Sequence, residues 1–169
     1  MNNHESRDVV IIGGGQSALA TAYFLRRENI DFIILDANEV PGGAWTRTWD
    51  SLKLFSPKEY SSLPGWMMPP TKETYPTREE IINYLTEYEK RYEFDIRRPV
   101  NVRNVSFHDG VFTIETDKGL INSKAIVSAT GNWSNPFIPT YMGQDLFQGE
   151  QIHSAFYKNP EELRGKRVL

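Results

Sequence analysis

A glycine-rich turn follows directly after an unbroken apolar run near the start of the chain, and this order constrains the fold more than any other feature. Residues 9–12 read Val-Val-Ile-Ile, which is typical of a central parallel strand covered on both faces. The turn is Gly13-Gly14-Gly15, and a helix is expected from Ser17 to Glu28. This strand–turn–helix unit predicts the α/β class with a doubly wound parallel sheet.

The spacing of the turn matches the G-x-G-x-x-A fingerprint of a dinucleotide site. Gly13 would allow the tight bend, Gly15 would let a pyrophosphate approach the backbone, and Ala18 would allow close packing of helix and strand. Gln16 and Ser17 open the helix, whose free N–H groups and positive dipole end would face the phosphates. The alternative is a strand-to-helix turn that is merely tightly packed.

An acidic residue after the next strand favours the nucleotide interpretation. Phe32-Ile33-Ile34-Leu35 predicts a second apolar strand, and Asp36 follows it at the distance of about 20 residues that the fingerprint requires. A carboxylate there would accept hydrogen bonds from a ribose 2′-hydroxyl and repel a 2′-phosphate, so NADP is not expected at this first site. Replacement of Asp36 is expected to weaken binding with little loss of folding stability.

Several later segments carry a family resemblance. Asp36, followed after five residues by Gly42-Gly43, resembles the FAD-binding half of flavoproteins with two dinucleotide domains. Gly-Gly-Ala-Trp45 and Ala-Thr130-Gly131 resemble motifs of flavin-containing monooxygenases. Phe147-x-Gly149-x₃-His153-x₃-Tyr157 is similar to the fingerprint of flavin-containing and Baeyer–Villiger monooxygenases. Segments 51–57 and 75–77 are similar to small bacterial flavoproteins known as cation-efflux or potassium-transport accessory oxidoreductases.

The resemblance implies a Rossmann-like FAD/NAD(P)-binding fold and FAD as the cofactor. Gly43, Trp45, Thr130 and Gly131 would then shape the flavin environment, beside the phosphate and ribose contacts given above. In an intact relative, NAD(P)H would reduce FAD, and the reduced flavin would use O₂ to oxygenate a small-molecule substrate. His153 would be a catalytic residue that couples the two steps. From the residues alone, a lone histidine is more often a hydrogen-bonded structural residue, and only the resemblance makes the two interpretations about equal.

One domain is expected over residues 1–169, and it is incomplete relative to the resembling family. Residues 147–169 would form a linker toward an NAD(P)H-binding domain. Residues 165–169 at its end read as a turn followed by the first residues of that domain's first strand. A non-catalytic nucleotide-binding fragment or half-length relative therefore stays open as an alternative. An NAD-dependent dehydrogenase is a third interpretation, which Gly-Gly-x-Trp disfavours.

The middle of the chain predicts loops, then a helix, then antiparallel strands. Prolines punctuate residues 41–76, and the apolar segment 63–68 is expected to pack under this loop rather than to line a substrate or partner surface. Thr77-x-x-Glu80 predicts a capping box, followed by a helix with apolar residues at 81, 84, 85, 88 and 92. Residues 100–123 alternate as a β-meander with turns at 109–110 and 118–119, and residues 125–129 would rejoin the parallel sheet.

Composition excludes several classes of site and partner. The net charge of −3 and the absence of Lys/Arg runs disfavour nucleic acid, and no stretch reaches the length of a membrane span. Residues 1–5 carry no signal-peptide core, so a cytoplasmic protein is expected, and a homo-oligomer stays open. The chain has no cysteine, and its histidines at 4, 108 and 153 lack ligand-like spacing, so no metal is expected. The missing cysteines also separate it from disulfide reductases of the same fold.

Overall fold

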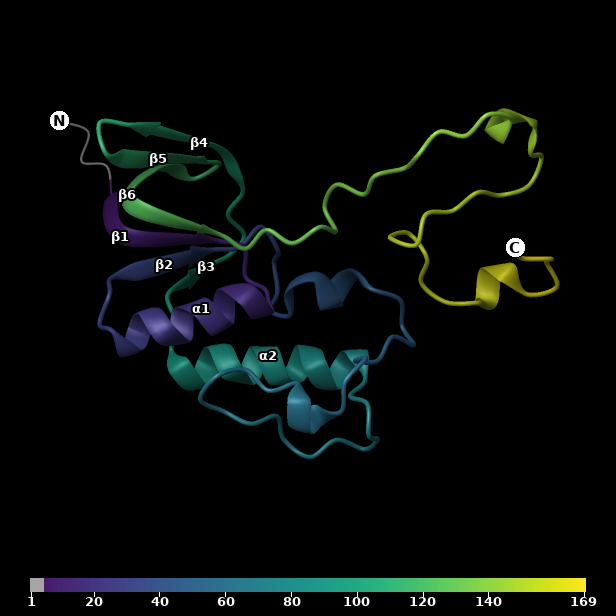
Figure 1. The fold of residues 1–169 in the computed structure, drawn as a ribbon, viewed down its shortest axis with the longest axis horizontal. Helices are drawn as coiled ribbons and strands as arrows, with labels where there is room; N and C mark the ends of the chain where they lie inside the picture. Colours follow the sequence, from purple (N-terminus) through teal and green to yellow (C-terminus); the bar gives the residue numbers. More distant parts are fainter. Residues whose placement is uncertain (1–4) are drawn as a thin grey trace.

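Six strands form one mixed sheet in the computed structural model, which describes residues 5–169 (Figure 1). His4 and the first residues of the N-terminal segment considered above lie outside the described residues. The sheet order is β3-β2-β1-β6-β5-β4. The strands are β1 (Glu5–Ile12), β2 (Phe32–Leu35), β3 (Ile96–Arg97), β4 (Val102–His108), β5 (Val111–Thr116) and β6 (Gly119–Ser128).

The sheet has a parallel half and an antiparallel half. Strands β3, β2, β1 and β6 are parallel, whereas β6, β5 and β4 form the predicted antiparallel meander. β6 belongs to both halves and is continuous, so the expected division between a meander that ends at residue 123 and a strand over residues 125–129 is wrong. Within β6, the buried Ser123 hydroxyl donates a hydrogen bond to the Ala125 carbonyl at 2.6 Å.

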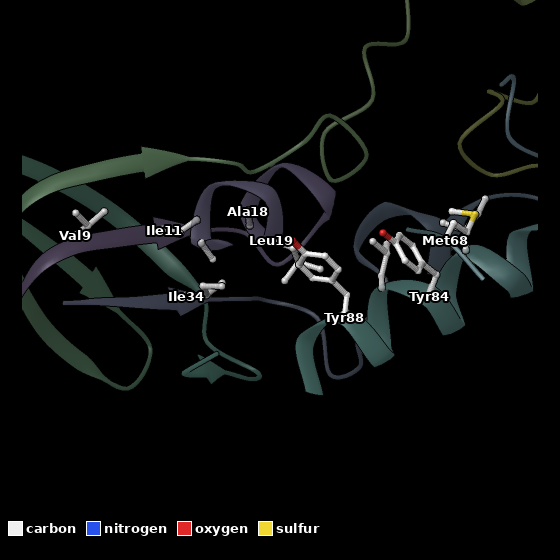
Figure 2. Packing of buried hydrophobic residues seen from close by; sticks show 11 residues of the cluster. Val9, Ile11, Ala18, Leu19, Ile34, Met68, Tyr84 and Tyr88 are labelled. Atoms are coloured by element: carbon white, nitrogen blue, oxygen red, sulfur yellow. The ribbon is translucent and has the colours of Figure 1, made fainter. Parts of the chain in front are cut away.

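The two faces of the parallel strands are covered differently. The α-helices α1 (Gln16–Arg27) and α2 (Arg78–Tyr92) lie on one face, where Val9, Ile11 and Ile34 point toward them (Figures 1 and 2). On the other face, Val10 and Ile33 pack against side chains of the antiparallel half. The α/β fold class is confirmed, and burial on both faces accounts for the unbroken apolar runs of β1 and β2.

Helix α2 begins with the predicted capping box. The Thr77 hydroxyl accepts a hydrogen bond from the Glu80 N–H, and the Glu80 carboxylate accepts one from the Thr77 N–H. Its aromatic stripe packs in the core, where Tyr84 and Tyr88 are buried, Tyr84 beside Met68 and Tyr88 beside Leu19 (Figure 2).

The tyrosine hydroxyls also anchor the proline-rich loop. The Tyr84 hydroxyl donates to the Trp66 carbonyl at 2.6 Å, and the Tyr88 hydroxyl donates to the Pro64 carbonyl at 2.5 Å. Packing of segment 63–68 is confirmed for Leu63, Trp66 and Met68, which contact the core, whereas Gly65 and Met67 are exposed. Regular structure in the loop is limited to the 3₁₀ turns η1 (Gly43–Arg47) and η2 (Lys58–Tyr60).

After β6 the chain leaves the sheet in an extended course (Figure 1). It contains two short 3₁₀ turns, η3 (Gln144–Leu146) and η4 (Glu161–Leu163). The segment contacts the body again near η1, where the Asp50 N–H donates to the Lys158 carbonyl at 2.9 Å. The linker role of residues 147–169 stays a prediction.

Candidate nucleotide-binding site

A cleft of about 540 Å³ lies at the carboxyl ends of β1, β2 and β6, within the size range of small-molecule sites. In open α/β sheets this end of the strands is where ligands bind. The predicted cofactor residues other than Ala18 line the cleft: Gly13, Gly15, Gln16, Ser17, Asp36, Gly43, Trp45, Thr130 and Gly131. The fold therefore brings together three motifs that are far apart in the sequence.

Gly13 is required by the fold itself. Its φ of 106° lies in the left-handed region, and a Cβ there would stand 2.2 Å from the Ala129 carbonyl oxygen. The Ala129 N–H in turn donates to the Ile12 carbonyl at 2.8 Å. The glycine-rich turn and the Ala-Thr-Gly turn are thus in direct backbone contact at the ends of β1 and β6.

Gly15 has a different environment. Its φ of −87° suits any residue, and a Cβ would meet only the Gly43 Cα at 3.9 Å. Gly15 is also the N-cap of α1, and no side chain among the described residues caps this helix end. Open space beside uncapped helix N–H groups fits a phosphate that approaches the backbone.

Ala18 lies outside the cleft. It is fully buried in the core between α1 and the sheet (Figure 2). The fingerprint requires a small residue at this third position, because helix and strand pack closely there.

Asp36 lies at the cleft but is only 1% exposed. Its Oδ2 accepts a hydrogen bond from Arg98 Nε at 2.7 Å, and its Oδ1 accepts from the Asn38 side chain at 2.9 Å. The remaining guanidinium nitrogens of Arg98 bind Glu89 of α2 at 2.6 and 2.9 Å. The sequence predicted little loss of folding stability on replacement of Asp36. Its pairing with Arg98 leads us to expect a larger loss, because replacement would leave a nearly buried arginine with one partner fewer.

Burial and ion pairing shift the pKa values of Glu89 and Arg98. Burial raises the pKa of Glu89, and the bidentate contact with Arg98 opposes that shift. Burial lowers the pKa of Arg98, but hydrogen bonds to Glu89 and Asp36 raise it more, so the guanidinium keeps its charge.

The Gly-Gly-x-Trp segment forms η1 against the glycine-rich turn. A Cβ on Gly43, whose φ is 55°, would lie 2.7 Å from the Gly15 Cα. Arg78 of α2 holds this segment in place, because its guanidinium donates hydrogen bonds to the carbonyls of Trp45 and Thr46 at 3.0 and 2.9 Å.

Arg47, the last residue of η1, was not predicted as a site residue. Its side chain lines the cleft and donates to Asn38 Oδ1 at 2.8 Å. It is the one cationic residue among the described residues that line the cleft. The Gly-Gly-x-Trp motif ends two positions before it, and only the folded turn shows where the side chain lies.

His153 does not line the cleft. Its Nδ1 accepts a hydrogen bond from the Ala155 N–H at 3.1 Å, and its carbonyl accepts from the Phe156 N–H at 2.8 Å. These are local turn contacts, and the catalytic role of His153 stays a prediction.

Two other kinds of feature, metal-ligand clusters and membrane-spanning helices, are considered within residues 5–169. No three histidine or acidic side chains gather in a geometry that could hold a metal ion. None of the described helices has the length and apolar character needed to cross a membrane.

The family assignment follows from comparison with known proteins. The family model for pyridine nucleotide-disulphide oxidoreductases matches residues 10–169. The chain belongs to this family. Its sequence has no cysteine, so these 169 residues hold no redox-active cysteine pair.

Individual relatives confirm the resemblance to flavin-containing monooxygenases. An uncharacterized oxidoreductase CzcO-like protein of Geobacillus kaustophilus is 35% identical, over 96% of this chain and 47% of the relative. The probable indole-3-pyruvate monooxygenase YUCCA8 of Arabidopsis thaliana is 33% identical, over 95% of this chain and 40% of the relative. A solved structure of a flavin-containing monooxygenase from Stenotrophomonas maltophilia superposes with a TM-score of 0.92 at 44% identity, covering 95% of this chain and 49% of that one. The chain thus spans about half the length of the curated bacterial relatives that it matches.

Proposed function

We propose that this chain binds FAD in the cleft, as the FAD-binding part of an NAD(P)H-dependent flavoprotein monooxygenase or oxidoreductase. The observation that carries the proposal is the convergence of Gly15, the uncapped start of α1 and Asp36 on one cleft of suitable size. Monooxygenase relatives with more than 30% identity along nearly the whole chain support it.

The residues present fit this cofactor. Gly15 leaves open the space that a pyrophosphate needs, and the N–H groups at the start of α1 would bind its oxygens. Asp36 would accept a hydrogen bond from the adenosine ribose, and Arg47 would balance the negative charge of the phosphates. Gly43, Trp45, Thr130 and Gly131 would border the rest of the cofactor.

FAD, once bound, would supply hydride acceptance and oxygen chemistry. The side chains of this chain would bind and orient it. NAD(P)H as reductant, a small-molecule substrate and a role for His153 are proposals for the whole protein. A cytoplasmic location and a homo-oligomeric state also stay predictions, which cell fractionation and analytical ultracentrifugation would test.

The test of the cofactor is direct titration. The purified chain should show visible flavin absorbance, or gain it when FAD is added, and calorimetry should give tighter binding of FAD than of NAD. Tighter binding of NAD would contradict the proposal and favour a dehydrogenase. Binding of FAD without reduction by NAD(P)H in the whole protein would favour the non-catalytic alternative.

A further inference from the structure

We propose that Glu89 and Arg98 set the nucleotide preference of the cleft at the adenosine ribose. Together with Asp36 they keep one net negative charge beside the cleft, which favours a free 2′-hydroxyl and excludes a 2′-phosphate. This inference rests on the proposed nucleotide site and concerns residues that lie behind it rather than on its surface.

The three side chains form a cluster that is almost entirely buried. Their side chains are 9%, 13% and 2% exposed for Glu89, Arg98 and Asp36. Arg98 lies between the two carboxylates, with contacts of 2.6 Å to Glu89 and 2.7 Å to Asp36. Two carboxylates around one guanidinium leave a net charge of about −1, and water screens it little at this depth.

Glu89 supplies the second negative charge of the cluster, which the single positive charge of Arg98 does not neutralise. Without it, Asp36 and Arg98 would form a neutral pair, and their field at the cleft would largely cancel. The bidentate contact also occupies the terminal nitrogens of Arg98 and leaves Nε for Asp36. Arg98 is therefore held away from any phosphate in the cleft, although arginine is the residue that elsewhere accommodates a 2′-phosphate.

The hydrogen bonds of Asp36 point to the same preference. Its Oδ1 accepts from both the Asn38 N–H and the Asn38 side chain, and its Oδ2 accepts from Arg98. A carboxylate offers about four acceptor positions, so about one remains for a ligand donor. A ribose hydroxyl can donate to it, whereas an ionised phosphate can only repel it.

Arg47 supplies a positive charge that opposes the net negative charge of Asp36, Glu89 and Arg98. It lines the cleft, and its guanidinium is bound to the Asn38 side chain rather than to a carboxylate. Once the charge of Glu89 is removed, the positive field of Arg47 is no longer outweighed, and a 2′-phosphate becomes acceptable.

The experiment compares two probes that differ by one phosphate. Calorimetric titration of the purified chain with ADP-ribose and with 2′-phospho-ADP-ribose gives an affinity ratio. The wild-type chain should favour ADP-ribose. Glu89→Gln should lower that ratio about tenfold, which is the size expected when one charge is removed from a poorly screened site.

Two further variants separate charge from packing. Glu87→Gln removes the same charge from the exposed side of α2, where Glu87 pairs with Lys90, and it should leave the ratio unchanged. The double variant Glu89→Gln/Arg98→Gln restores a net charge of about −1 through Asp36 alone, so it should recover the wild-type preference. Thermal unfolding of each variant reports its stability separately.

Each result decides between the interpretations. Equal loss of affinity for both probes in Glu89→Gln would show a merely structural role, and a wild-type ratio near one would also overturn the proposal. If Glu89→Gln does not fold, a double variant without preference for ADP-ribose contradicts it. Failure of the wild-type chain to bind either FAD or ADP-ribose would instead remove the nucleotide site itself.

Discussion

Gly43 stands against Gly15 so closely that a Cβ on Gly43 would lie 2.7 Å from the Gly15 Cα. This contact joins the Gly-Gly-x-Trp segment to the glycine-rich turn, so the two motifs shape one surface. The second glycine of Gly-Gly-x-Trp is therefore needed for the contact between two loops of the protein, before any ligand is considered.

Gly43→Ala should damage both stability and FAD binding. Its φ of 55° costs a side chain about 1 kcal/mol, and displacement of the glycine-rich turn adds to this, for a total of about 2–3 kcal/mol. The matched control is Gly110→Ala, which has a φ of 81° but no atom within 4 Å of the added Cβ. Urea unfolding should show a clearly smaller loss for the control, and equal losses would contradict the clash.

Gly15→Ala should separate binding from folding. The added methyl group meets only the Gly43 Cα at 3.9 Å, so the free energy of unfolding should change by no more than about 1 kcal/mol. FAD affinity should fall strongly, because the methyl group occupies the space that a pyrophosphate needs. Gly13→Ala serves as the contrast, since its Cβ would meet the Ala129 carbonyl at 2.2 Å and folding itself should fail. Unchanged FAD affinity in Gly15→Ala would place the phosphates elsewhere.

Sequence patterns predicted the elements whose signals are local. The apolar runs of β1 and β2, the capping box of α2 and the two hairpin turns depend on neighbouring residues, and all of them are present in the structure. The position of Asp36 at the end of β2 was also predicted, because the apolar run before it and its spacing from the glycine-rich turn are visible in the sequence.

The features that the sequence missed depend on tertiary contacts. Strand β3 consists of Ile96–Arg97 alone, which is too short to show a period of two. Glu89 and Arg98 are ordinary helix and loop charges until α2 packs beside the end of β2. Arg47 lines the cleft, where it binds Asn38 and where Arg78 holds the preceding turn through the Trp45 and Thr46 carbonyls.

Arg47→Gln should weaken FAD binding by about tenfold, which corresponds to the loss of one charge-assisted hydrogen bond. The affinity of the variant should also depend less on salt than that of the wild-type chain, because one cation no longer faces the phosphates. Arg103→Gln on β4 is a control with an exposed residue outside the cleft. Fluorescence titration at two salt concentrations measures both effects, and equal affinities for Arg47→Gln and Arg103→Gln would exclude Arg47 from the site.

Asp36→Ala should lower the free energy of unfolding by about 2–4 kcal/mol, because it removes one partner of a nearly buried guanidinium. Glu89 remains on Arg98 and limits the loss. Asp31→Ala is the control, since Asp31 is exposed and binds Arg7 at 2.9 Å near the protein surface. A loss under 1 kcal/mol in urea unfolding would show that the pairing of Asp36 with Arg98 contributes little.

The contact between Glu5 and Arg97 predicts a pH dependence of stability. Arg97 on β3 reaches past β2 to Glu5 on β1 with contacts of 2.6 and 2.7 Å. Hydrogen bonds from Arg97, and to a smaller extent from Arg7, lower the pKa of Glu5 from 4.5 to about 2. Since the folded pKa is depressed, the contribution is fully present above the unfolded value of 4.5 and is lost as the pH falls toward about 2. It should amount to about 1 kcal/mol, because both side chains are about one-third exposed and solvent screens the pair.

Glu5→Gln should lower the stability at pH 7 and flatten the decline between pH 4.5 and about 2, whereas the exposed Glu87→Gln should leave the decline intact. Parallel declines in the wild-type chain and in Glu5→Gln, measured by urea unfolding across this range, would assign the acid sensitivity to other carboxylates.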